Sequence, residues 1–283
     1  MNDSQVTIGE GRELAYTDLG HPSDACVFFF HGAPMSRLHL VALEDQFAAL
    51  GLRVVSPDRP GYGRSSPQSG RSMADWPRDV ASLADALGID RFVVTAHSSG
   101  GPYAVACSAL LPERVLAGAV VAGVTDMAWP GAWDGYLEDE IQLMRAPDEE
   151  AAVTWCTERF GPDGRGFLAE PFEFPEPDVA LLTDEAFEEA LLATMAEAFR
   201  QGVVGYAQDV YIQGRPWSFD PSSISVPVEV VHGELDTLVP MAHSRHTAEL
   251  IRSSTFRTFP GHGHLTILSE LPMIASTLVR SIR

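Results

Sequence analysis

One stretch of the sequence changes from a buried strand to a helix within a few residues, and it limits the fold more than any other. Residues 92–96 are apolar and rich in β-branched side chains, which is typical of a strand buried in a sheet. Small residues follow, and Pro102 then stands in the first turn of a segment that predicts a helix. We therefore expect a sharp strand-to-helix turn that holds the hydroxyl of Ser98 out of the sheet.

Further apolar runs predict strands and helices on both sides of this turn. Strands are expected at 26–30, 53–57, 115–123, 226–231 and 255–259, after an opening hairpin at 6–19, and helices at 38–50 and 73–87. Strands that alternate with helices indicate an α/β fold with a parallel, doubly wound sheet and right-handed crossovers. The chain of 283 residues is long enough for one large domain of this kind.

The residues around Ser98 resemble a known motif. They read Ala96-His97-Ser98-Ser99-Gly100, and the α/β-hydrolase family has Gly-x-Ser-x-Gly at its nucleophilic serine. Alanine replaces the first glycine, at a position that must be small because strand and helix pass close together. Taken alone, these residues are equally compatible with a tight structural turn.

Two further segments resemble the same family. His31 and Gly32 follow a predicted central strand, as in the family's oxyanion loop, where the backbone N–H of Ala33 would face the nucleophile. The segment 58–65 reads Asp-Arg-Pro-Gly-Tyr-Gly-Arg-Ser and resembles a conserved turn of the family. We interpret this turn as structural, with glycines for its backbone angles and charges that pair near the site.

The acid and the base of the site are expected near the end of the chain. The segment 232–240 resembles the family's acid loop, and Asp236 is the matching residue; Asp126, which also follows a predicted strand, is the weaker alternative because no motif surrounds it. His264 matches the family's histidine because Leu265 would begin the closing helix. His262 also follows a glycine and is the weaker alternative.

The order Ser98, Asp236, His264 is the order that the family uses. A serine hydroxyl is a poor nucleophile at neutral pH and needs a neighbouring base, which His264 would supply. Asp236 would fix the tautomer of the imidazole and stabilise its cation. The backbone N–H groups of Ala33 and Ser99 would stabilise the oxyanion. His31, His97 and His232 are expected to form hydrogen bonds within their loops.

The alternation of strands and helices stops between about 125 and 220. The resemblance implies a mostly parallel sheet of eight strands, formed by 1–124 and 221–283, with 125–220 as an inserted helical cap. In the cap, Leu137, Ile141 and Met144 share one helix face, and a longer helix beginning at 177–178 would extend to Phe199. The insertion holds 21 of the 39 acidic residues and only five of the 19 arginines, which disfavours anionic substrates.

Composition excludes several classes of partner. The net charge is -20 and every basic residue is arginine, which argues against nucleic acid and anionic membrane surfaces as partners. No apolar run reaches the ~20 residues that span a bilayer, and the first residues lack a signal pattern. Three cysteines without metal-ligand spacing favour reduced thiols in a cytoplasmic protein, with no metal or cofactor expected. The oligomeric state is left open.

The predicted function is that of a serine hydrolase acting on a small-molecule substrate. The resemblance implies cleavage of a small, mostly apolar carboxylic ester, thioester or lactone through an acyl-enzyme. Fold does not fix function, so a non-hydrolytic lyase, a cyclase or a C–C bond enzyme on the same scaffold is the main alternative. A ligand receptor that retains the three residues is a weaker one.

Overall fold

The apolar runs of the sequence lie side by side in one sheet of the computed structural model, which describes residues 2–21, 25–170 and 172–282. The strands of the described residues are β1 Asn2–Thr7, β2 Glu13–Gly20, β3 Cys26–Phe30, β4 Arg53–Pro57, β5 Phe92–His97, β6 Val115–Val121, β7 Val228–Gly233 and β8 Ser254–Phe259. These eight strands have the order β1-β2-β4-β3-β5-β6-β7-β8. The pairs β1–β2 and β2–β4 are antiparallel and the five other neighbouring pairs are parallel, so the predicted mostly parallel sheet is confirmed.

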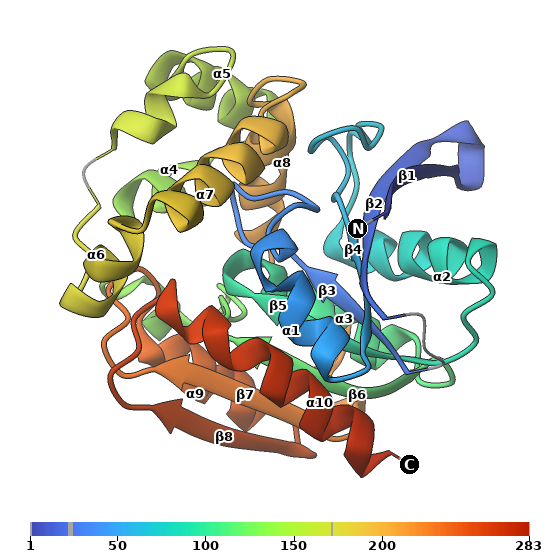
Figure 1. The fold of residues 1–283 in the computed structure, drawn as a ribbon. Coiled ribbons are helices and arrows are strands. Elements are labelled where there is room, and N and C mark those ends of the chain that lie inside the picture. The colour runs from blue at the N-terminus through green and yellow to red at the C-terminus, as the bar shows by residue number, and fades with distance from the viewer. Residues whose placement is uncertain (1, 22–24, 171, 283) are drawn as a thin grey trace.

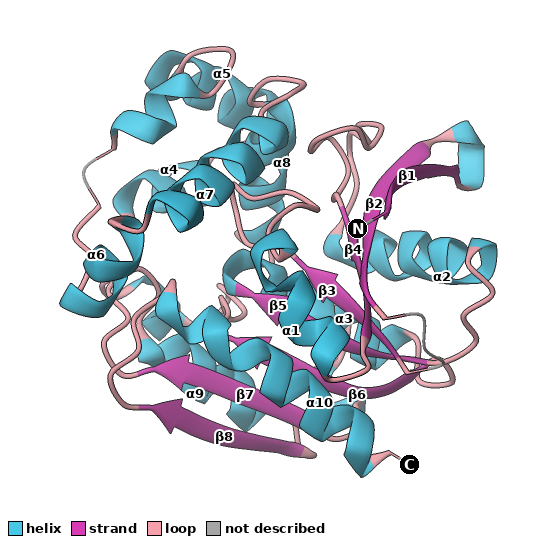
Figure 2. Ribbon diagram, in the orientation of Figure 1, coloured by secondary structure: helices cyan, strands magenta, loops and turns pink. Residues whose placement is uncertain are grey.

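Helices cover both faces of the sheet (Figure 2). Those outside the insertion are α1 Glu44–Ala49, α2 Trp76–Ala86, α3 Gly101–Leu110, α9 Met241–Leu250 and α10 Leu271–Ser281. Side chains alternate along a strand, so Phe28 and Phe30 of β3 pack with α2 and α3, whereas Val27 and Phe29 pack with α1 and α10. This two-sided burial explains why β3 reads as an uninterrupted apolar run.

Five helices stand between β6 and β7 in the described chain. They are α4 Glu138–Met144, α5 Glu149–Phe160, α6 Glu176–Leu182, α7 Glu185–Ala198 and α8 Val204–Gln213, and they lie above the arrowheads of β7 and β8 (Figure 1). Four of them, α4, α5, α7 and α8, share an apolar cluster, which also includes Tyr62 and Val239. None of the helices in the described residues is both long and apolar enough to cross a membrane.

Two predicted helices differ from those in the structure. The segment expected at 38–50 is helical only from 41, because Thr17 Oγ1 donates to the Arg37 carbonyl at 2.7 Å and the chain before Val41 forms turns. The helix expected from 177 to 199 is two helices, α6 and α7. The carboxylate of Asp184 accepts a hydrogen bond from Phe187 N at 2.9 Å and so caps a new helix where a continuous one was predicted.

Candidate active site

The predicted turn at Ser98 is present. The strand β5 ends at His97, a short 3-10 helix covers Ser98–Gly100, and α3 begins at Gly101. Ser98 has a φ of +56°, a backbone conformation that residues other than glycine rarely adopt and that costs about 1–3 kcal/mol. A Cβ at Gly100 would overlap the Phe30 carbonyl oxygen, so glycine is required there. Ala96 is fully buried beside Phe30, where its small side chain fits.

The structure brings His264 and Asp236 together. His264 follows β8 and Asp236 follows β7, and the two strands are parallel neighbours whose carboxyl ends lie at one edge of the sheet. His264 Nδ1 lies 2.7 Å from Asp236 Oδ2, and both side chains are buried. The other carboxylate oxygen of Asp236 accepts hydrogen bonds from Leu238 N at 2.9 Å and Val239 N at 3.0 Å. These bonds fix the carboxylate toward the imidazole.

The charges of this pair stabilise each other. Burial alone would lower the pKa of His264, but the charge and hydrogen bond of Asp236 outweigh it, and the net shift of the His264 pKa is upward. Burial raises and the imidazolium lowers the pKa of Asp236, with a net downward shift. The carboxylate therefore stays ionised, and its charge favours the protonated form of the imidazole.

The weaker alternatives from the sequence lie elsewhere. Asp126 Oδ1 accepts a hydrogen bond from Ala128 N at 3.0 Å within its own loop. His262 faces Glu270, with 3.7 Å between Nε2 and Oε1. Neither contacts the His264–Asp236 pair through an interaction of the described residues, so the structure favours Asp236 over Asp126 and His264 over His262.

Ser98 and His264 line the same cavity, whose volume is about 220 Å³. Among the described residues, no hydrogen bond joins Ser98 Oγ to the imidazole of His264. Such bonds are often long in an unliganded site and shorten when the substrate binds. Most of the cavity wall is apolar. Its side chains come from the loops after β3 and β7, from α7 and from the segment between α5 and α6, and they include Met35, Phe167, Phe172, Leu191, Met195 and Val239.

Two backbone N–H groups lie beside the serine. Ala33 lines the cavity, and its N–H donates no hydrogen bond within the described part of the chain. Ser99 stands in the first turn of the short helix that begins at Ser98, where N–H groups lack a helical acceptor. An added Cβ at Gly32 would lie 3.1 Å from Ser98 Cβ, so the loop before Ala33 approaches the serine closely. These are the two N–H groups that the sequence analysis predicts for the oxyanion hole.

Two further histidines pack near His264: His97 contacts it directly, and His39 contacts His97. His97 Nε2 donates to the His264 carbonyl oxygen at 2.9 Å, and the two rings lie 4.5 Å apart. His39 packs against His97 at 5.4 Å. Burial, together with the nearby charge of His264, lowers the pKa of His97 and lowers that of His39 to about 3. Both rings are thus neutral near pH 7.

Asp178 is a site residue that the sequence analysis treated only as the start of a helix. It lies on α6, fully buried, and its carboxylate accepts hydrogen bonds from Leu265 N at 3.1 Å and Thr266 N at 2.9 Å. The Thr266 hydroxyl donates a third, at 2.7 Å. Asp178 therefore fixes the loop that carries His264. No local pattern marks it, because its partners lie more than eighty residues away.

The predicted turn at 58–65 also has a distant partner. Arg59 Nη2 and Arg71 Nη2 each lie 2.8 Å from a carboxylate oxygen of Asp209 on α8, and all three side chains are buried. The Tyr103 hydroxyl donates to Asp209 at 2.6 Å. Arg59 also donates to the His31 carbonyl, so this cluster joins α8 to the loop before Ala33. One feature of the sequence could have identified Asp209: it is an acidic residue between Tyr206 and Val210, on the apolar face of a helix.

No group of three or more His, Cys, Asp or Glu side chains is placed to hold a metal ion in the part of the chain that the structure describes.

Known proteins resemble this chain along most of its length. A bifunctional esterase/perhydrolase from Acinetobacter calcoaceticus is 28% identical and covers 98% of this chain and 99% of its own. A non-heme chloroperoxidase from Streptomyces lividans is 28% identical over 94% of this chain and 95% of its own. The structure of a thermophilic esterase from Thermogutta terrifontis has a TM-score of 0.72 and 22% identity, covering 100% of this chain and 99% of that one, which shows a shared fold.

The family model for the alpha/beta hydrolase fold matches residues 26–271, which include Ser98, Asp236 and His264. The chain belongs to the alpha/beta hydrolase fold family.

Proposed function

We propose that the protein is a serine hydrolase that cleaves small, mostly apolar carboxylic esters, thioesters or lactones through an acyl-enzyme on Ser98. The observation that carries the proposal is the 2.7 Å contact between His264 Nδ1 and Asp236 Oδ2, at the edge of the cavity that Ser98 also lines. The esterase names of the relatives support an ester-hydrolysing activity.

Each group has one step in the proposed mechanism. His264 Nε2 takes the proton of the Ser98 hydroxyl as the oxygen attacks the carbonyl carbon, and the N–H groups of Ala33 and Ser99 stabilise the oxyanion. The same imidazole then gives the proton to the leaving alcohol, thiol or ring oxygen. Water, activated by His264, attacks the acyl-enzyme in the second half of the reaction and releases the acid.

The walls of the cavity support the proposed substrate class. The apolar side chains of α7 and of the loop after β3 suit an alkyl or aryl acyl group, and the cavity volume of about 220 Å³ suits a small one. We further propose that α4–α8 act together as a cap that keeps bulk water from this cavity, with residues 1–124 and 221–283 as the core beneath it.

Hydrolysis is distinguished from lyase or cyclase chemistry by the fate of solvent oxygen. In ¹⁸O-labelled water, hydrolysis of a neutral ester such as p-nitrophenyl butyrate places one labelled oxygen in the carboxylic acid. Mass spectrometry of the acid measures it. Turnover that yields product without label would exclude the proposed hydrolysis and favour the non-hydrolytic alternative.

The pH dependence of hydrolysis should follow His264. Because the neutral imidazole is the base and its pKa lies above the ordinary 6.5, kcat/KM is expected to fall as the pH drops through that raised pKa. In Asp236→Asn the acid limb should move to lower pH, and kcat should fall by about 10⁴-fold because the imidazole loses its tautomer and its counter-charge. A pH–rate profile of both proteins measures this, and an acid limb that stays in place would contradict it.

Asp178 is expected to act as a positioning residue. In Asp178→Ala the loop of His264 loses three hydrogen bonds, so kcat should fall by about 10–100-fold with little change in KM. The acid limb should also move to lower pH, since the charge of Asp178 raises the pKa of His264. The control is Glu176→Ala, an exposed acid on the same helix. If Asp178→Ala melts at a lower temperature but keeps the wild-type pH profile, the role of Asp178 is structural only.

A further inference from the structure

A second cavity adjoins the one that holds Ser98. Its volume is about 240 Å³, and it lies among the helices of the insertion. We call it the side cavity, and its wall consists of Leu137, Glu138, Asp139, Glu140, Phe160, Phe167, Glu170, Phe172 and Tyr206. Five of these residues also line the cavity of Ser98, among them Glu140 and Phe172. A substrate whose reacting carbonyl lies at Ser98 can therefore extend along Glu140.

Glu140 is a buried carboxyl group between the two cavities. It is 7% exposed, and its only hydrogen bond within the described residues is to the Tyr136 hydroxyl, through one of its two oxygens. Burial raises the pKa of Glu140, although the hydrogen bond of Tyr136, the charge of His264 and the nearby Tyr206 hydroxyl oppose the rise. A buried carboxyl without a cationic partner is costly and is stabilised when a cation binds.

The Tyr206 hydroxyl is a second polar group of the side cavity without a partner. The residue is 1% exposed, and its oxygen forms no hydrogen bond within the described residues. Glu140 lies close enough to raise the pKa of Tyr206 through its charge, after burial as the larger cause. The two groups are thus close neighbours, and a polar group that enters the side cavity can contact the carboxylate and the hydroxyl together.

The charges and rings of the side cavity favour a cation. None of its lining residues is basic. Arg159 pairs with Asp139 at 3.1 Å and Glu170 at 2.6 Å, so one positive charge faces two negative ones. Glu140 forms no ion pair within the described residues, although the charge of His264 acts on it from a distance. Apart from Leu137, the remaining wall is aromatic, and the faces of aromatic rings attract cations.

We propose that the side cavity binds an ammonium group of the substrate, at the end remote from the bond that is cleaved. Glu140 accepts a charge-assisted hydrogen bond from it, the Tyr206 hydroxyl supplies a second acceptor, and the rings of Phe167 and Phe172 surround its alkyl chain. The substrate class is thus an apolar ester, thioester or lactone with an amino group at its far end. The inference rests on the proposed function only in placing the reacting end at Ser98.

Binding of alkylammonium ions tests the side cavity without any ester bond. Calorimetric titration of the wild-type protein with n-butyl-, n-hexyl- and n-octylammonium chloride is compared with titration by the 1-alkanols of the same length. We expect at least one ammonium ion to bind about tenfold more tightly than its alkanol, because a hydrogen bond between charged partners is stronger than a neutral one. Equal affinity for ion and alcohol would overturn the proposal.

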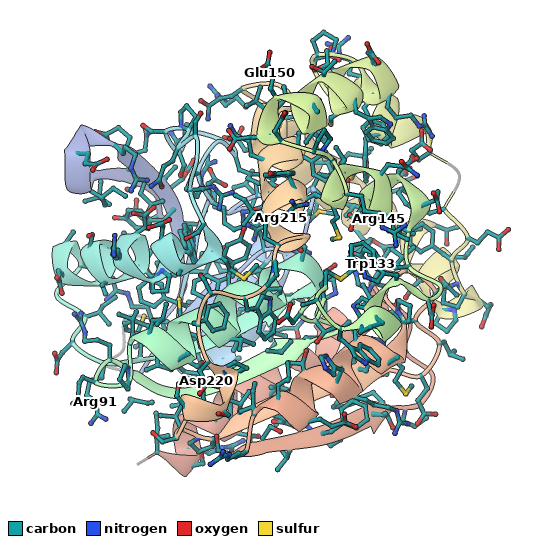
Figure 3. The ribbon with its side chains drawn as sticks, turned by 180° about the vertical axis from the view of Figure 1, so that it is seen from behind. Arg91, Trp133, Arg145, Glu150, Arg215 and Asp220 are labelled. Atoms are coloured by element: carbon teal, nitrogen blue, oxygen red, sulfur yellow. The ribbon has the colours of Figure 1, made fainter. Side chains whose placement is uncertain are left out.

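Two variants test whether the ammonium ion binds at Glu140. Glu140→Gln keeps the shape of the side chain and should abolish the preference for the ammonium ion. Glu150→Gln removes the same charge from the outer end of α5, where the side chain is exposed (Figure 3), and should keep it. A preference that survives in Glu140→Gln would overturn the proposal. If Glu140→Gln does not fold, as thermal melting would show, Tyr206→Phe decides instead. Its ammonium affinity should fall about threefold while its alkanol affinity stays the same, and an unchanged ammonium affinity would overturn the proposal.

The outcomes separate this proposal from the proposed function. If ammonium binding depends on Glu140 but the protein does not hydrolyse esters, the proposed ammonium site is supported and the proposed serine hydrolase activity is wrong. If ester hydrolysis depends on Ser98 but the protein shows no preference for ammonium ions, the serine hydrolase activity is supported and the ammonium site is wrong.

Discussion

Replacing Ser98 by alanine is expected to lower kcat/KM for a neutral ester by about 10⁵-fold. The substitution removes the hydroxyl of Ser98, which lines the cavity from a strained turn. It leaves α3 and the backbone N–H groups of Ala33 and Ser99 unchanged. Residual turnover over the uncatalysed rate should persist, because the oxyanion hole and the binding cavity still act without the nucleophile.

The measurement is steady-state turnover of p-nitrophenyl butyrate by purified variant and wild type, with circular dichroism to show that both are folded. Ser108→Ala is the matched control, since Ser108 lies on the same helix and its hydroxyl donates only to the Ala104 carbonyl. If Ser98→Ala retains the activity of Ser108→Ala, the acyl-enzyme mechanism is wrong.

The largest effect on stability is expected at Asp209. In Asp209→Ala, Arg59 and Arg71 keep their charges in the interior but lose the carboxylate that pairs with both, and the Tyr103 hydroxyl loses its acceptor. Removing one partner of a buried ion pair costs about 3–5 kcal/mol in the free energy of unfolding. The two arginines hold the pKa of Asp209 well below its usual range against the opposing effect of burial, which agrees with a fully ionised cluster.

Urea unfolding of Asp209→Ala and wild type at neutral pH measures this loss. Asp134→Ala, which removes an exposed acid from the same insertion, should change the free energy of unfolding by less than about 0.5 kcal/mol. A loss at Asp209 no larger than the loss at Asp134 would mean that the buried cluster contributes little to stability.

Local patterns in the sequence were sufficient to predict the sheet and the three side chains proposed for catalysis. Each of Ser98, Asp236 and His264 follows a strand, and a parallel sheet brings the carboxyl ends of its strands to one edge, so their meeting follows from topology. The alanine at position 96 fits because the position requires a small side chain.

The residues that support the site could not be predicted in the same way. Asp178 and Asp209 act on partners that are distant in sequence, and neither stands in a motif. Their roles depend on how the helices of the insertion pack over the sheet, which hydrophobic periodicity does not specify. The long helix expected at 177–199 is two helices for a local reason. Asp184 is the N-cap residue of α7, so a new helix begins there although the apolar spacing continues unchanged, and periodicity does not reveal the break.

The claim on which the mechanism depends is that Ser98 is the activated nucleophile of the chain. A fluorophosphonate probe reacts with a serine hydroxyl only where a base and an oxyanion hole activate it. After labelling of the folded protein, mass spectrometry of its peptides should find one adduct per chain, on Ser98, and none in His264→Ala. Labelling of another residue, or equal labelling of Ser98 without His264, would contradict the mechanism.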